Sequence, residues 1–137
     1  MKCLISAGSA AMTLLLGTTA TAADEPLRAG NKVYQSICQT CHGTHSPVDA
    51  PKLGDRRTWA PLIAEGQTVL TAHAWVGVRG MPARGGDPDL TLEEFGRAVA
   101  HMARSAGARW RDPDGDAELM QSIRSEAKKR QAAGAGR

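Results

Sequence analysis

The segment that most constrains this chain is Cys38-Gln39-Thr40-Cys41-His42, which has the pattern C-x-x-C-H. This pattern is typical of c-type haem attachment, in which two thiols add to the haem vinyl groups and the histidine becomes the proximal ligand of the iron. Two intervening residues allow one turn of helix to carry both sulfurs to the same side. The pentapeptide therefore predicts a helix that runs into a covalently bound haem.

A C-x-x-C pair has two other common uses, as half of a zinc site or as a thiol–disulfide redox pair. A zinc site would need a second Cys/His pair at ligand spacing, and the sequence has none. A redox pair would need a βαβ setting, which the surrounding sequence does not offer. We therefore favour haem attachment, which the adjacent histidine, the leader and a downstream methionine all support.

The first 22 residues have the pattern of a cleaved signal peptide. Met1-Lys2 supplies a basic start, Leu4 to Leu16 is mostly apolar, and Ala20-Thr21-Ala22 is an A-x-A cleavage signal. Several Ser, Thr and Gly residues make this stretch too polar for a stable membrane span. We expect export to the periplasm, with Cys3 lost alongside the leader.

Composition limits the hydrophobic core and excludes one class of partner. About 115 residues remain after the leader, which is enough for one small domain. Only 4% of the chain is aromatic, so we expect a buried haem to supply the missing apolar area and the haem-free chain to fold poorly. The net charge is +3, with no long basic stretch and no aromatic stacking series, which excludes nucleic-acid binding.

Apolar spacing predicts an all-α fold. Val33, Ile37 and Cys41 lie at fourfold spacing, and Thr91 with Glu94 forms a capping box. No stretch alternates long enough to propose a sheet. The expected helices are Arg28 to Thr40, Asp55 to Ala64 with Pro61 in its first turn, Gln67 to Val78 with Leu70 and Ala74 inward, Thr91 to about Ser105, and Asp116 to Ala132, followed by fraying from Ala133.

The candidate for the second axial ligand of the iron is Met81. Gly80 lets the backbone approach the ring and Pro82 stiffens the loop, which is a poor place for a methionine that only fills a core. Met102 and Met120 instead sit at helical spacing among apolar residues, so we expect both in the core.

Histidine ligation remains an alternative. His73 and His101 lie on expected helices, and either could complete a bis-histidine site with a lower reduction potential. His45 is too close to His42 to serve, and we expect its side chain to be exposed.

With these residues in place, the chain resembles class I monohaem cytochromes c, and among them the cytochrome c5 group, from about Gly30 to Ser105. This resemblance implies a small fold of about four helices wrapped around one covalent haem c, which shuttles one electron and is not an enzyme. Beyond the pentapeptide, it is carried by Gly30, Tyr34, Ala50-Pro51-Lys52-Leu53-Gly54-Asp55, Trp59, Gly80-Met81-Pro82, Gly85-Gly86, Ala98-Val99 and Met102.

The resemblance also implies roles for single residues. The carbonyl of Pro51 would accept the second ring N–H of His42 and raise its basicity. Leu53 would line the haem ring, and the indole N–H of Trp59 would donate to a propionate. Gly30 would let the first helix cross closely against the last.

Three positions depart from the family pattern. Ala83 stands where a second proline often follows the ligand methionine, which predicts a looser loop. Leu62 replaces an arginine that pairs with a propionate, which leaves that pairing to Arg56 or Arg57 or to no residue. His101 stands near the place of an aromatic ring at the helix crossing.

These observations divide the chain into a signal peptide (1–22), a cytochrome c domain (23–105) and a C-terminal extension (106–137). We expect a monomeric electron carrier of the periplasm with unidentified redox partner proteins. The extension leaves open a second function, a haem c subunit of a larger periplasmic oxidoreductase or oxidase complex. The favoured arrangement is that the apolar face of the extension folds back on the domain. A third hypothesis, a gas sensor or peroxidase, requires Met81 to be detached.

Five basic side chains flank the expected haem-binding segments. They could form a basic rim that steers an acidic partner, or an ordinary solvated surface. They are Lys52, Arg56, Arg57, Arg79 and Arg84.

Overall fold

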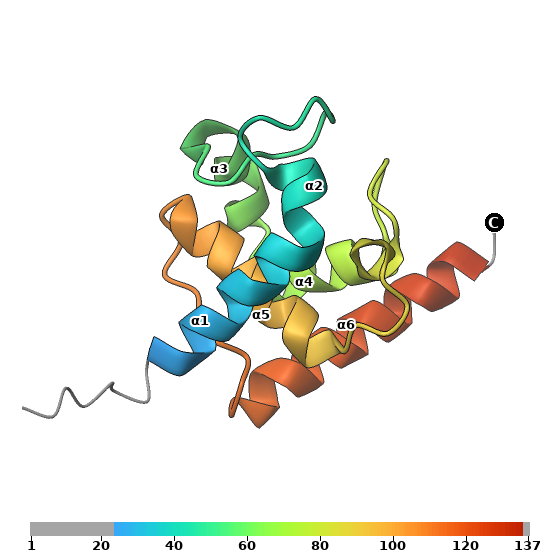
Figure 1. Ribbon diagram of the computed structural model, residues 1–137. Helices are drawn as coiled ribbons and strands as arrows, with labels where there is room; N and C mark the ends of the chain where they lie inside the picture. The colour runs from blue at the N-terminus through green and yellow to red at the C-terminus, as the bar shows by residue number, and fades with distance from the viewer. Residues whose placement is uncertain (1–23, 136–137) are drawn as a thin grey trace, which may run out of the picture.

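The structure, a computed structural model, describes residues 24–135 of the chain. Its regular elements are helices (Figure 1). The expected signal peptide lies outside the described residues. The all-α prediction is confirmed, and no strand occurs between residues 24 and 135. The elements are α1 (Asp24–Val33), η1 (Tyr34–Cys38), α2 (Gln39–His42), α3 (Arg56–Ala64), α4 (Gln67–Val76), η2 (Ala83–Gly86), α5 (Leu92–Ser105) and α6 (Ala117–Ala135).

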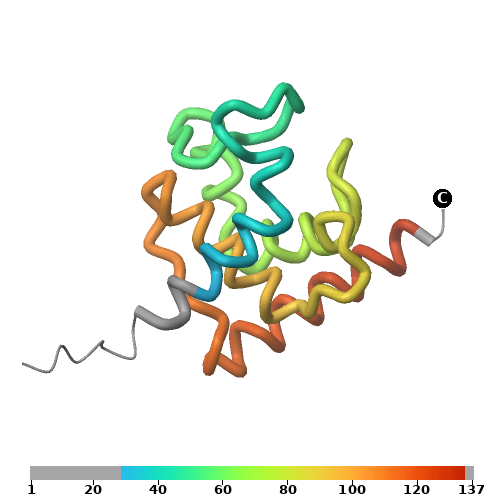
Figure 2. The backbone as a smooth tube through the Cα atoms, viewed as in Figure 1, coloured from blue at the N-terminus to red at the C-terminus, as the bar shows by residue number. Residues whose placement is uncertain are grey.

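The elements α1, η1 and α2 follow one another without a break and carry the chain to the C-x-x-C-H motif (Figure 2). The middle segment, η1, is a π-helix, whose i→i+5 hydrogen bonds widen the turn. In an α-helix, residues four apart drift by about 40° around the axis at each step, and a wider turn offsets this drift. Gly30, Tyr34, Cys38 and His42 are accordingly all buried. The predicted apolar stripe of Val33, Ile37 and Cys41 lies beside this buried series and is only half-buried.

The first helix crosses α5 at Gly30. A Cβ atom at Gly30 would lie 2.5 Å from the carbonyl oxygen of Arg97, so a side chain there would force the helices apart. One turn further on, the ring of Tyr34 packs against that of His101 with the centroids 5.5 Å apart. The close crossing predicted at Gly30 is confirmed, and His101 occupies the place expected of an aromatic ring.

Local capping sets where α3 begins and where α5 begins and ends. Asp55 accepts hydrogen bonds from the amides of Arg57 and Thr58 at the start of α3. Thr91 forms the predicted capping box at the start of α5. Gly107, with φ of +103°, ends α5 because glycine adopts this left-handed conformation readily.

The predicted place of Pro61 is wrong. Pro61 lies inside α3 and not in its first turn. A proline there removes a hydrogen bond to the carbonyl of Arg57. Both residues are exposed, so water can satisfy that carbonyl and the short helix tolerates the loss.

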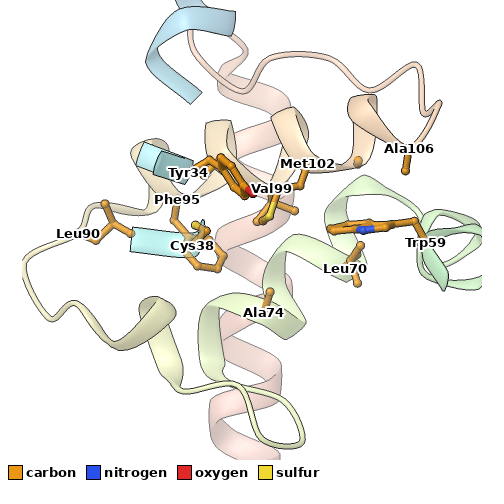
Figure 3. Packing of buried hydrophobic residues seen from close by; sticks show 12 residues of the cluster. Tyr34, Cys38, Trp59, Leu70, Ala74, Leu90, Phe95, Val99, Met102 and Ala106 are labelled. Carbon is orange, nitrogen blue, oxygen red and sulfur yellow. The ribbon is translucent and has the colours of Figure 1, made fainter. Parts of the chain in front are cut away.

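The main cluster, a set of buried side chains from η1, α3, α4, α5 and the adjoining segments, forms the core beside the C-x-x-C-H motif (Figure 3). Leu70, Ala74 and Met102 point into it as predicted. Because Cys38 is itself a member, the attachment motif opens directly onto this core. The main cluster comprises Tyr34, Cys38, Trp59, Leu70, Ala74, Leu90, Phe95, Ala98, Val99, Met102, Ala103 and Ala106.

The C-terminal extension folds back on the domain, as favoured above. Helix α6 packs along α4, and its buried face consists of Leu119, Met120, Ile123 and Ala127. Leu92 of α5 packs against this face. The apolar stripe of the extension is therefore covered by its own domain.

The segment that leads into α6 is also fixed to the domain. Gln67 and Arg111 exchange two hydrogen bonds, of 2.6 Å to the Arg111 carbonyl and 3.0 Å from its amide. Pro113 is fully buried, and a Cβ atom at Gly96 would lie 3.1 Å from it. Helix α6 continues to Ala135, past the point where fraying was expected. No helix between residues 24 and 135 is long and apolar enough to cross a membrane.

Candidate haem-binding site

The two cysteines of the motif are free and lie where η1 passes into α2. Cys38 is buried and Cys41 is half-buried. Burial, and to a lesser degree the neighbouring Cys41, raise the pKa of the Cys38 thiol to about 11. Such a thiol stays protonated at neutral pH and lacks the lowered pKa of a redox-active cysteine. In residues 24–135, moreover, no three His, Cys, Asp or Glu side chains gather as a metal site.

His42 is held in one orientation by the loop that follows it. Its side chain is buried, with a relative exposure of 8%, and Nδ1 lies 2.8 Å from the carbonyl oxygen of Pro51. A carbonyl can only accept, so Nδ1 carries the proton and Nε2 is left as the basic nitrogen. This is the hydrogen bond that the resemblance implied for Pro51, and it prepares an imidazole as an iron ligand.

The proximal loop, residues 43–55, is held by hydrogen bonds to its backbone carbonyls and to those of the motif. The amide of Leu53 donates to the carbonyl of His42 at 2.8 Å. Lys52 Nζ donates to the carbonyl of Cys41 at 3.0 Å and also to that of Val48. Lys52 is therefore tied to the loop, and its part in a basic rim stays a prediction.

Trp59 lies in the main cluster with only 3% of its surface exposed. Its indole N–H donates to the carbonyl of Lys52 at 2.8 Å, a bond that sequence reasoning did not anticipate. A donor role toward a propionate stays a prediction, and it would require this bond to be exchanged. Leu53, expected to line the haem, packs against the main cluster.

The Met81 loop, residues 77–90, approaches the same cluster from the end of α4. The amide of Met81 donates to the carbonyl of Val78 at 2.9 Å across a two-residue turn. The carbonyl of Met81 accepts from the amide of Val78 at 3.2 Å. Met81 is half-buried and packs against the main cluster. The structure thus brings Met81, Leu53, Trp59 and Cys38 to one core.

The other histidines have different surroundings. His73 lies on α4 with Nδ1 2.8 Å from a carboxylate oxygen of Glu65. His101 packs on Tyr34, and its buried Nε2 has no hydrogen-bond partner. Burial, followed by the charge of Arg104, lowers the pKa of His101. His45 is exposed, as expected.

Among the predicted basic rim residues, Arg84 has a specific contact that sequence reasoning missed. Its guanidinium carbon lies 4.9 Å from the centroid of the Trp75 ring. Arg56, Arg57 and Arg79 are exposed. A basic residue in a loop beyond the end of a helix carries no local signal for this contact, because the loop conformation decides which ring it meets.

Comparison with known proteins identifies the family. Residues 25–102, more than half of the chain, match the family described as "Cytochrome C oxidase, cbb3-type, subunit III". The chain belongs to this cytochrome c family. The cytochrome c match ends before α6, so the C-terminal extension lies beyond it.

Two relatives of this cytochrome c are both named cytochrome c-555. The protein from Chlorobaculum tepidum is 40% identical over 106 residues, which cover 74% of this chain and 95% of that protein. The protein from Chlorobaculum thiosulfatiphilum is 45% identical over 78 residues, which cover 54% of this chain and 90% of that protein. The resemblance to monohaem class I cytochromes c is therefore confirmed.

A solved structure supports the fold of this cytochrome c. The chain aligns with a TM-score of 0.53 and 41% identity, over 57% of its length and 94% of the other chain. That structure is titled "Crystal structure of electron transfer complex of nitrite reductase with cytochrome c". The predicted cytochrome c fold is confirmed.

Membership of the family implies a haem c, and the residues present fit one. Two unpaired thiols lie one turn apart and next to a buried histidine whose Nδ1 is already bonded. The core beside them is apolar, and a methionine packs against it from the opposite loop. These donors match the proximal and distal ligands that a c-type haem takes.

Proposed function

We propose that this protein carries single electrons in the periplasm on one haem c, attached through Cys38 and Cys41 and ligated by His42 and Met81. The observation that carries the proposal is the hydrogen bond from His42 to Pro51 beside two free cysteines. This bond fixes the tautomer and the orientation of the imidazole next to the thiols that would hold the haem. The leader of residues 1–22 supports export.

Each residue of the site would tune the redox centre in a defined way. A bound haem c supplies a one-electron couple. The Pro51 carbonyl orients the His42 imidazole and would strengthen it as a donor to the iron. The neutral, soft sulfur of Met81 favours the ferrous state, and the apolar main cluster disfavours the extra charge of the ferric state. Both effects raise the reduction potential.

The partners would be redox proteins that dock transiently. The cytochrome c in the similar solved structure forms an electron-transfer complex with nitrite reductase. Arg56, Arg57 and Arg79 are exposed on this chain and could steer an acidic partner. If they do, the rate of reaction with such a partner falls as ionic strength rises, and a rate that is independent of salt removes the steering role.

The second candidate function is a haem c subunit of a larger oxidoreductase or oxidase complex. The matched family is described as an oxidase subunit, which favours this function. The buried apolar face of α6 favours a free carrier instead, because that face is already covered by the domain. Gel filtration of the native protein from its source separates the two, since a carrier elutes at the size of the monomer.

The central test is an optical spectrum of the exported protein. Reduced spectra after denaturation in pyridine should show a haem bound through two thioethers, and mass spectrometry should find a chain that begins at Ala23 and carries one haem. Met81→Ala should open the iron to carbon monoxide and remove the iron–sulfur charge-transfer band. A bare peptide mass would refute the proposal, and an unchanged Met81→Ala spectrum would refute the sixth ligand.

A further inference from the structure

The two residues of the Arg84–Trp75 contact flank Met81 in the sequence and meet in space. Trp75 is next to the last residue of α4, before the Met81 loop begins. Arg84 comes three residues after Met81, and its guanidinium lies over the Trp75 ring at 4.9 Å. The contact therefore closes the loop segment that carries the methionine.

Both partners of this contact are anchored further into the protein. The Trp75 ring meets the edge of Phe95, a member of the main cluster, at a centroid distance of 5.5 Å and an angle of 69°. Arg84 Nη1 donates to the carbonyl of Pro88 at 2.6 Å. The guanidinium is thus fixed from both sides, by the ring and by the chain that leads to α5.

The backbone turn at Arg84 sets where its side chain lies. Its φ is +56°, in the left-handed region that residues with a side chain adopt rarely, and Arg79 in the same loop shares it with φ of +53°. The next residue, Gly85, has φ of +67°, and a Cβ atom there would lie 3.3 Å from Ile37, the residue before Cys38. The same turn therefore places Arg84 over Trp75 and brings the loop against the attachment helix.

We propose that Arg84 and Trp75 are positioning residues whose stacking keeps Met81 against the haem-binding core. This rests on the proposed ligation by Met81. A loop that opens exposes the distal side of the iron, so the stack sets how often a competing ligand can enter. Neither residue touches the iron or exchanges electrons in this role.

The test uses the holoprotein and the variant Arg84→Gln, which keeps a polar chain but loses the cation. Carbon monoxide binding to the reduced protein reports how often the methionine leaves the iron. We expect binding to be about two- to fivefold faster, which corresponds to the loss of one exposed cation–π contact. Arg84→Lys should restore part of the difference, because it keeps the cation.

The matched control is Arg79→Gln, because Arg79 lies in the same loop, carries the same charge and is exposed. It should leave the carbon monoxide rate unchanged. Trp75→Leu should reproduce the effect of Arg84→Gln, and the double variant should show little more than either alone. Equal rates for Arg84→Gln and Arg79→Gln overturn the positioning role.

Hydrogen exchange separates failure of this proposal from failure of the ligation. The amide of Met81, bonded to the carbonyl of Val78, should exchange faster in Arg84→Gln than in the Arg79→Gln control. If Met81→Ala opens the iron while Arg84→Gln changes neither exchange nor carbon monoxide binding, only the positioning role is wrong. If Met81→Ala changes nothing, both proposals fall.

Discussion

The two loops beside the proposed iron ligands, one that follows His42 and one that carries Met81, are held in different ways. The proximal loop is fixed by side chains that donate to backbone carbonyls, from His42 to Pro51, from Lys52 to Cys41 and from Trp59 to Lys52. The Met81 loop is held by a two-residue backbone turn, by one cation–π contact and by one side-chain bond, from Arg84 to the carbonyl of Pro88. His42 is buried, whereas Met81 is half-buried.

This difference suggests that the two ligands have different stabilities. Contacts in a buried network open only with much of the surrounding structure, whereas an exposed loop can open by itself. We therefore expect changes around the proximal loop to reduce the stability of the whole fold. Changes around the Met81 loop should mainly affect how firmly the methionine is held.

The largest expected effect comes from Trp59→Ala. Removing this buried ring should cost about 3–5 kcal/mol in the free energy of unfolding, since it leaves a cavity and removes one of the two hydrogen bonds to the Lys52 carbonyl. Unfolding of the holoprotein in guanidinium measures this loss of free energy. Trp75→Ala, on the side of the Met81 loop, should cost clearly less because Trp75 is half-buried. Equal losses for the two variants would remove the proposed contrast between the loops.

A second comparison lies within the Met81 loop. Gly85→Ala should cost about 1–2 kcal/mol, because Gly85 has φ of +67° and the new Cβ atom would lie 3.3 Å from Ile37. Gly80→Ala should cost less in the polypeptide itself, since no protein atom lies within 4 Å of the position its Cβ would take and only a nearby haem would oppose it. Thermal unfolding of the two variants measures the difference. If Gly85→Ala is neutral, the loop does not pack closely against Ile37.

Lys52→Met tests the carbonyl contacts of the proximal loop. It should cost about 1 kcal/mol, because a charged donor to the Cys41 and Val48 carbonyls is lost, and of these two Val48 keeps its bond from the amide of Ala50. Hydrogen exchange should rise in residues 43–51 and stay unchanged in residues 77–86. The exposed Arg57→Met is the control for removing one positive charge. A uniform rise in both loops would contradict independent anchoring.

The smallest effect concerns pH. The hydroxyl of Thr58, followed by the amides of Thr58 and Arg57, lowers the pKa of Asp55, which caps the helix after the proximal loop. Its ionised form therefore stabilises the fold fully above the ordinary value of about 3.9, and this stabilisation is lost as the pH falls through the lower folded value.

Asp55→Asn keeps an acceptor at the cap and removes the titrating group. We expect a small stability difference from the wild type at pH 7 that shrinks as the pH falls below about 4. Denaturant unfolding at both pH values measures it. A difference that stays constant with pH would show that the charge of Asp55 contributes nothing.

Local signals made much of the fold predictable. The capping box at Thr91 and the cap at Asp55 depend on residues three apart or closer, so sequence alone located the starts of α3 and α5. The apolar stripe of α6 predicted a covered face. The π-helix of η1 and the interior place of Pro61 were not predictable, because tertiary packing and solvent exposure decide them.

The candidate site also has features that the sequence predicted and features that it did not. The pentapeptide identified Cys38, Cys41 and His42, and the resemblance supplied the contact with Pro51. The bond from Trp59 to Lys52 and the stack of Arg84 on Trp75 join segments through loop conformations. At Arg84 that conformation has a positive φ without a glycine to signal it, so no sequence pattern revealed the contact.

The π-helix at η1 keeps the helix crossing and the attachment motif in phase along one helix. Gly30 meets α5, and Cys38, two four-residue steps further on, opens onto the core. Ordinary α-helical winding from Gly30 to Cys38 would carry the cysteine about 80° further around the axis. A change that converts η1 to an α-helix without altering its length would therefore turn the cofactor attachment away from the core while leaving every ligand in the sequence.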